Sequence, residues 1–288
     1  MKTVQLKQKI KNGENLGAII RTMKALAGVS IHHYEKSRSS LEEYSSIIET
    51  ALHGLLSRSK FHFSRSAGGE NGMIVIGSDH GLCGAFNEQI CNYAENIYNN
   101  KGGRVISIGE RAVSEMMDRK IKSEYSSLLP SSLKGTGSLV SNILSHIQIW
   151  QEKGITEILL VCNTPLKNSY TQKQKIIYPP SRAWLNHLQK KKWNGRTLPY
   201  FTSSPPELFS GLIREYIHIS LLQGIMESQT AENAARLATM QRAEKNLEES
   251  LAKSINDFRQ ERQKNITDEL LDIVSGYEII LEKGKHMK

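Results

Sequence analysis

Proline is missing from both ends of the chain. All seven prolines of the 288 residues lie between Pro130 and Pro206. Because a proline inside a helix costs about 3 kcal/mol, its absence leaves both ends free to form long helices. We predict helices from Thr3 to Ser57 and from Glu207 to Lys283, about 80 and 115 Å long at roughly 1.5 Å per residue. Such helices exceed the roughly 30 Å width of a small domain, so we expect them to form a rod.

Cysteines and long apolar runs are also scarce. Three cysteines are too few for a disulfide framework, which favours a reducing compartment. No run reaches the roughly 18 apolar residues of a membrane span, and the basic start of the chain lacks the apolar segment of a secretory signal. The apolar content of 39% suits a rod that buries one stripe of each helix. The formal charge of +9 indicates an acidic partner: nucleic acid, a membrane surface or a protein.

Signatures of catalysis are weak. The turn Asp79–Gly84 (DHGLCG) follows an apolar run, but it has neither the G-x-G-x-x-G spacing of a dinucleotide site nor a phosphate-binding loop. We interpret it as a tight turn that needs residues without a Cβ; nucleotide binding there is the competing enzyme hypothesis. His32 and His33 have no cysteine or carboxylate at a spacing that completes a metal site. We therefore predict no catalytic, cofactor-binding or metal-binding residue.

Acidic residues are absent between Ile158 and Pro206, and two tryptophans, Trp184 and Trp193, lie beside a lysine triplet in this stretch. The basic residues gathered there are Lys167, Lys173, Lys175, Arg182, Lys190, Lys191, Lys192 and Arg196. Three interpretations stay open: a solvated surface, a docking patch for acidic protein loops or phospholipid headgroups, and a single-stranded nucleic acid site.

Both ends carry an apolar seam with alternating spacings of three and four residues, which is typical of a helix packed along a partner helix. The first seam comprises Ile20, Met23, Ala27, Ile31, Tyr34, Leu41, Ile48, Leu52 and Leu55. The second comprises Leu247, Leu251, Ile255, Phe258, Ile266, Leu270, Ile273 and Tyr277, with Arg262 filling its gap. We predict an antiparallel pair, because a compact middle domain holds the end of one helix near the start of the other.

The C-terminal helix outruns its partner by roughly 30 Å if both leave the middle domain together. Its tip carries the apolar residues Leu270, Leu271, Ile273, Val274, Ile279, Ile280 and Leu281. Because such residues need cover, we predict that other chains enclose the tip. The alternative is a tip that folds back onto its own chain.

The middle of the chain alternates strands and helices, which favours a small, mostly parallel sheet. The expected strands are Met73–Ser78, Arg104–Ile108, Ile155–Cys162 and an edge strand at Lys175–Tyr178. The expected helices are Phe86–Tyr98, Glu110–Arg119 and Gly137–Glu152, the last capped by Ser138. The expected domains are an N-terminal coiled-coil helix (1–60), a central βα domain (70–200) and a C-terminal coiled-coil helix (205–286).

Several motifs, in order along nearly the whole chain, resemble the gamma subunit of F-type ATP synthases. Glu227–Arg236 (ESQTAENAAR) is similar to the family's S-E-x-A-A-R-M segment, and Arg262–Gly276 (RQKNITDELLDIVSG) to its R-Q-x-x-I-T-x-E-[IL]-x-E-I-V-S-G signature. Ser78–Gly84 (SDHGLCG) is similar to its S-D-R/K-G-L-C-G turn. His80 in that turn and the apolar stretch Leu16–Ile20 depart from the family pattern and resemble a divergent branch, such as the alternate N-type ATPases.

The resemblance implies an α/β fold with a long antiparallel two-helix coiled coil and a small Rossmann-like βα domain. It implies a non-catalytic rotor shaft, with no cofactor, that couples ion-driven rotation to ATP synthesis or hydrolysis. The implied partners are the alpha and beta subunits of a catalytic hexamer, an epsilon-like subunit and the membrane c-ring, at the cytoplasmic face of the bacterial inner membrane. No nucleic acid is expected.

By motif matching, the resemblance places contacts with the beta-subunit catch loop at Arg262, Gln263 and Thr267, with Met23 and Lys24 nearby on the first helix. We also expect Lys190, Lys191 and Lys192 to dock at the c-ring or the membrane surface. The competing function is a non-catalytic basic coiled-coil adaptor that binds nucleic acid.

Overall fold

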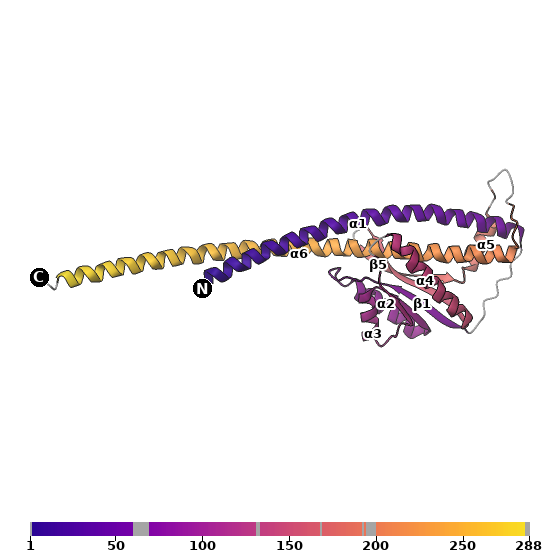
Figure 1. Cartoon of the computed structure of the whole chain (residues 1–288), viewed down its shortest axis with the longest axis horizontal. Helices are drawn as coiled ribbons and strands as arrows, with labels where there is room; N and C mark the ends of the chain where they lie inside the picture. The colour runs from indigo at the N-terminus through magenta and orange to yellow at the C-terminus, as the bar shows by residue number, and fades with distance from the viewer. Residues whose placement is uncertain are drawn as a thin grey trace. The chain divides into compact units, whose positions relative to one another are not determined.

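A computed structural model describes residues 2–59, 69–130, 133–167, 169–191, 193 and 200–285. The chain divides into two compact units, one formed by Met1–Leu26 with Ala238–Lys288 and the other by Ala27–Leu237. Two long helices, α1 (Lys2–Arg58) and α6 (Pro205–Lys285), contribute to both units (Figure 1). Both helices confirm the prediction that the proline-free ends run long, with bounds within two residues of those expected.

In the first unit, α1 and α6 pack antiparallel. Lys2 pairs with Glu261 at 3.1 Å, whereas Lys24, farther along α1, pairs with Glu244, earlier on α6. Gly17 on α1 is buried, and a Cβ added to it would meet Leu247 of α6 at 3.5 Å. This register confirms the predicted antiparallel coil.

The α1 seam is confirmed in each unit taken by itself. Ile20 is buried in the first unit, and the seam residues Ala27, Ile48, Leu52 and Leu55 are buried in the second. The α6 seam is confirmed only in part. Arg262, expected on the seam, is exposed, and Glu261 takes the inward position beside Lys2.

The second unit contains a five-stranded sheet of order β3-β2-β1-β4-β5. Its strands are β1 (Glu70–Ile76), β2 (Arg104–Ile108), β3 (Tyr125–Ser127), β4 (Ile155–Leu166) and β5 (Ser169–Tyr178). Its shorter helices are α2 (Phe86–Lys101), α3 (Glu110–Asp118), α4 (Leu133–Glu152) and α5 (Arg182–Lys190). β1, β2, β3 and β4 pair in parallel and β5 pairs antiparallel with β4, so the predicted mostly parallel sheet is confirmed.

Helices cover both faces of this sheet (Figure 1). On one face, Val75 and Val105 pack with residues of α2 and α3 in a single apolar cluster. On the other face, Ile74 and Ile106 pack with Trp150 of α4 and with residues of α1, α5 and α6 that belong to this unit. The parallel strands β1, β2 and β4 are therefore buried on both sides, as their continuous apolar runs predict.

Glu124, just before β3, fastens α4 to the sheet. Its carboxylate accepts hydrogen bonds from Trp150 Nε1 at 2.8 Å, from Arg104 at 3.0 Å and from Lys153 at 3.0 Å. Burial acts to raise the pKa of Glu124, but these donors together lower it to about 2. The carboxylate therefore stays charged, and it links β2, the start of β3 and α4.

Several boundaries differ from the sequence predictions. α4 begins at Leu133, so Ser138 lies inside the helix and bonds Gly135 O at 2.7 Å, which makes its assignment as a cap wrong. The edge strand begins at Ser169 and is longer than expected. β3 and α5 have no counterpart among the predicted elements. Within the described residues, no helix combines the length and the apolar character that crossing a bilayer requires.

Candidate functional site

The glycine turn after β1 is held by the carboxylate of Asp79. Its Oδ1 accepts a hydrogen bond from the backbone N–H of Glu110, which opens α3, at 3.0 Å, and its Oδ2 accepts one from Leu129 N at 2.8 Å. Gly84 has φ = 65°, in the left-handed region that favours glycine. Both carboxylate oxygens of Asp79 are therefore engaged by backbone amides of the chain itself. This geometry fits a structural turn and not a nucleotide site.

α6 holds the same turn through an ion pair. The Arg236 Nη2 atom lies 2.5 Å from Glu232 Oε1 and donates to the carbonyl oxygens of His80 at 3.4 Å and Gly81 at 3.3 Å. Glu232 is only 5% exposed, and its burial raises the pKa of this carboxyl although Arg236 opposes the change. This pair anchors α6 to the turn within the second unit.

Sequence reasoning assigned no role to this pair, although the matched segment contains it. The signal was the spacing of Glu232 and Arg236, because residues four apart on a helix lie on one face and form ion pairs. What could not be read from the spacing was that the pair points toward the turn after β1.

Met23 and Lys24 lie on the part of α1 that faces α6. Met23 is half-buried, and the Lys24 ammonium is paired with the Glu244 carboxylate, with 28% of the lysine side chain exposed. The charge of Lys24 is thus neutralised by a carboxylate of the same chain.

Arg262, Gln263 and Thr267 lie on the exposed surface of α6. The Thr267 hydroxyl bonds the backbone oxygen of Gln263 at 3.0 Å within the helix. Since Lys24 meets α6 at Glu244, eighteen positions before Arg262 on the same helix, the two predicted contact sets lie about 27 Å apart along α6. They do not form one site on this chain.

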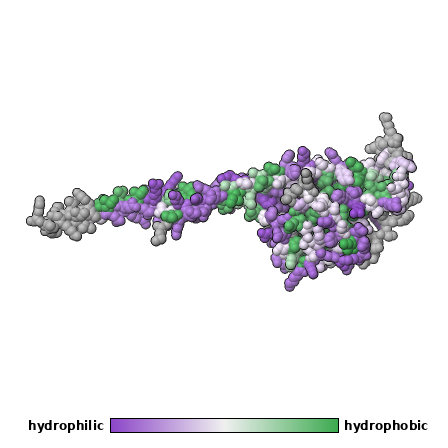
Figure 2. All heavy atoms as spheres, viewed as in Figure 1, coloured by the Kyte–Doolittle hydropathy of each residue, from purple (hydrophilic) through white to green (hydrophobic). Residues whose placement is uncertain are grey.

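The end of α6 is apolar and exposed. Lys2 and Thr3, at the start of α1, contact Glu261 and Asn265, so α1 gives no cover beyond this level. The exposed residues that follow are Ile266, Leu270, Leu271, Ile273 and Val274, each between 48% and 68% exposed. Apolar residues are visible on this stretch of the surface (Figure 2). The predicted lack of intrachain cover is confirmed for Leu270, Leu271, Ile273 and Val274, and Ile266, expected on the α6 seam, is exposed as well. The side chains of Ile279, Ile280 and Leu281 lie outside the described residues.

The basic stretch is not one continuous surface. Lys173 lies 3.8 Å from Glu227, and the Lys175 ammonium donates to Ser220 Oγ at 3.1 Å and lies 5.3 Å from the centre of the Tyr216 ring. Lys190 and Lys191, at the end of α5, are exposed, and Lys192 lies outside the described residues.

The two tryptophans beside the lysines contact the chain's own side chains. Trp184 packs against Tyr216 with 4.7 Å between ring centres, and Trp193 packs against His53 with 5.5 Å. Each tryptophan ring already packs against a ring of the same chain. The arrangement therefore does not favour the single-stranded nucleic acid interpretation, which needs aromatic rings that bases can stack on.

The described residues give little support for a redox-active cysteine pair or a metal site. All three cysteines are buried as free thiols, and burial raises the pKa of both Cys91 and Cys162 to about 12. Within the described part of the chain, no three histidine, cysteine or acidic side chains cluster closely enough to hold a metal ion. His53 is buried, and among the described residues neither of its ring nitrogens has a hydrogen-bond partner.

Comparison with known proteins gives consistent results. The profile of the ATP synthase family matches residues 2–280. The ATP synthase gamma chain of Geotalea daltonii is 25% identical over 96% of this chain and 97% of that protein. The gamma chain of Buchnera aphidicola subsp. Schlechtendalia chinensis is 27% identical over 94% of this chain and 96% of that protein.

Solved structures share the fold. A chain from the OSCP/F1/c-ring structure of the Euglena gracilis mitochondrial ATP synthase is similar with a TM-score of 0.67 at 17% identity, over 99% of this chain and 96% of that chain. A chain from the rotor of the same enzyme gives a TM-score of 0.66 at 15% identity, over 92% of this chain and 99% of that one.

Proposed function

The chain belongs to the ATP synthase family as a gamma chain, the non-catalytic central rotor shaft, and from this premise we propose which of its surfaces meet which partners. The observation that carries the proposal is the apolar end of α6, which extends past the start of α1 with its side chains exposed. An exposed apolar surface of this kind marks an interaction site. We assign the enclosing partner to the hexamer of alpha and beta subunits.

Rotation of the shaft would act on the hexamer through differential contact. α6 presents different side chains on its different faces, so each orientation of the shaft favours a different conformation of each beta subunit. A ligand or a neighbouring chain shifts such an equilibrium only by as much as its contacts with the two states differ. The shaft therefore needs no catalytic residue of its own.

Within this arrangement, Arg262, Gln263 and Thr267 are the proposed contacts with the catch loop of the beta subunit. Their side chains are exposed in the chain by itself, which leaves them available to a partner. Met23 and Lys24 of α1 would contact the hexamer at a separate level of the shaft, about 27 Å from Arg262 along α6, with Lys24 keeping its pairing with Glu244.

We predict that Gln263→Ala combined with Thr267→Ala lowers the ATPase activity of the assembled complex by about tenfold. Two lost hydrogen bonds, at about 0.5–1.5 kcal/mol each, would account for this change. The isolated variant should keep its helix content, because both side chains are exposed. Gln241→Ala, an exposed glutamine elsewhere on α6, is the matched control. Full activity of the assembled double variant would show that these residues are not the contact.

The other proposed contact is basic and belongs to α5. Lys190 and Lys191, with Lys192, would dock on the c-ring or on the adjacent membrane surface, and an epsilon-like subunit would bind nearby. The chain would then be peripheral at the cytoplasmic face of the bacterial inner membrane. Support comes from the exposure of Lys190 and Lys191 and from the absence of acidic residues between Ile158 and Pro206 in the sequence.

We predict that Lys190→Glu with Lys191→Glu weakens attachment to c-ring-containing membranes by about tenfold or more at low salt. A lysine near an anionic surface contributes about 1 kcal/mol, and salt screens the contribution. Lys36→Glu with Lys122→Glu, two exposed lysines of the same unit, is the control. Attachment that is equal for both pairs at every salt concentration would contradict the assignment.

Co-expression tests the whole proposal. With the alpha and beta subunits of the same organism, a rotor shaft should yield a stable ATPase only when this chain is present. Salt-sensitive binding of oligonucleotides without recovery of either subunit would instead support the nucleic-acid adaptor.

A further inference from the structure

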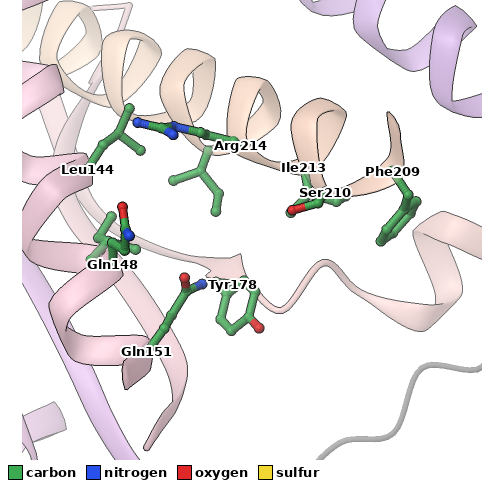
Figure 3. Close-up of a pocket in the computed structure, with 10 residues that line it drawn as sticks. Leu144, Gln148, Gln151, Tyr178, Phe209, Ser210, Ile213 and Arg214 are labelled. Carbon is green, nitrogen blue, oxygen red and sulfur yellow. The ribbon is translucent and has the colours of Figure 1, made fainter. Parts of the chain in front are cut away.

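A cleft of about 490 Å³ opens in the second unit between α4, the start of α6 and the end of β5 (Figure 3). Its volume falls within the roughly 300–1,000 Å³ that is usual for small-molecule sites. The residues that line it are Leu144, Ile147, Gln148, Gln151, Tyr178, Phe209, Ser210, Ile213, Arg214 and Ile217. None of the assigned functions of the chain uses this cleft.

The floor and the rim of the cleft differ in character. Ile147, Ile213 and Ile217 are buried and form an apolar floor, to which Leu144 and Phe209 add further apolar surface. The rim is polar. Gln148 and Gln151 stand on α4, and Arg214 extends from α6 toward α4 (Figure 3). A ligand that fits both parts has an apolar body and a polar head.

The charged residues that line the cleft determine whether the polar head of the ligand is anionic or cationic. Arg214 is exposed, and within the described residues no hydrogen bond or ion pair joins its guanidinium to another side chain. No acidic residue is among the ten that line the cleft, all of which are described. A guanidinium matches a carboxylate by two parallel hydrogen bonds, and the neighbouring carboxamides can donate further ones. The cleft is therefore complementary to a single anionic group.

We propose that this cleft binds a medium-chain fatty acid, with the carboxylate at Arg214 and the alkyl chain along the apolar floor. One cation and one apolar strip fit an amphiphile with one charge and one chain. The site lies in the sheet-containing unit and is independent of the partner surfaces proposed above.

The test is calorimetric titration of the full chain with dodecanoate below its micellar concentration. One molecule should bind per chain, and dodecyltrimethylammonium, which has the same alkyl chain and the opposite charge, should not bind at the same concentration. Arg214→Gln should weaken dodecanoate binding by about tenfold, as expected for loss of a charge-assisted bidentate contact. Arg242→Gln, an exposed arginine elsewhere on α6, should leave binding unchanged.

A second variant tests whether the ligand binds in the cleft. Ser210 is an exposed residue of the rim, so Ser210→Trp should fill the cleft and abolish binding without lowering the melting temperature. Three results would overturn the proposal: no binding of dodecanoate, equal binding of the cationic amphiphile, or equal losses in Arg214→Gln and Arg242→Gln. The last two would show unspecific adsorption to exposed apolar surface such as the end of α6.

Discussion

At the scale of single residues, Arg236 joins a buried carboxylate to the turn after β1. It neutralises the buried Glu232 carboxylate and donates to two carbonyl oxygens of the turn after β1. Removing one member of a buried ion pair is costly, because the other charge is left without compensation. The role of this residue can therefore be tested by measuring the free energy of unfolding of the isolated chain.

We predict that Arg236→Met lowers the free energy of unfolding at pH 8 by about 3 kcal/mol. The pKa of Glu232 is already raised above its ordinary 4.5, and loss of the arginine raises it further. A carboxyl with a raised folded pKa is destabilising where it must be ionised, so the deficit should shrink as the pH falls toward 4.5. Urea denaturation at pH 8 and at pH 5 measures it.

The control for this prediction is Arg242→Met, an exposed arginine without a carboxylate partner among the described residues. Adding Glu232→Gln to Arg236→Met should recover part of the stability at pH 8 and remove the pH dependence. A deficit that is the same at both pH values would show that Glu232 is not the group left unpaired.

At the scale of the element, glycines of α1 differ according to what faces them. An added Cβ at Gly28 would meet no atom within 4 Å, whereas one at Gly13 would lie 2.6 Å from Leu251 Cδ2 of α6. Glycine inside a helix costs about 0.5–1 kcal/mol relative to alanine. An alanine at Gly28 therefore reports helix propensity alone, whereas an alanine at Gly13 also reports the packing of α1 against α6.

We predict that Gly28→Ala raises the free energy of unfolding by about 0.5–1 kcal/mol. Gly13→Ala should gain less or destabilise, because Leu251 must move away from the new methyl group. Thermal melting followed by the helical circular dichroism signal compares the two variants. An equal gain at both sites would mean that α1 and α6 do not approach closely at Gly13.

At the scale of the whole molecule, we propose that the end of α6 contributes to assembly and not to the fold of the chain. Its apolar side chains are exposed, in contrast to seam residues such as Ile20, which is 6% exposed. A hydrophobic side chain contributes to folding only through the area that it buries. The exposed residues should therefore contribute when a partner covers them.

We predict that Leu270→Ser with Ile273→Ser leaves the melting temperature of the isolated chain within about 1 °C and lowers the yield of assembled ATPase several-fold. Ile20→Ser, in the buried seam, should instead destabilise the chain by about 2–4 kcal/mol. Amide hydrogen exchange adds a second measurement, because uncovered helix exchanges fast. Slow exchange after Asn265 in the isolated chain would show that the end folds back onto its own chain.

Proline placement and apolar spacing determined the two long helices. A compact middle domain between them predicted their antiparallel pairing, and the alternation of strands and helices predicted the mostly parallel sheet. These features depend on local preferences repeated over many residues, and repetition averages out local exceptions. The motif order further determined the family. β3 was beyond this reasoning, because three residues are too few to show a period.

Tertiary structure alone decided which side chains face inward and where. Arg262 was expected on the seam, but Glu261 took that place beside Lys2. A straight helix drifts by about 20° per heptad relative to a 3.5-residue repeat, so a seam counted across a gap loses its phase. The contact of Arg236 with the turn after β1 and the cleft between α4 and α6 likewise join residues far apart in sequence. Such contacts depend on how the elements pack, and one sequence read along its length does not contain that information.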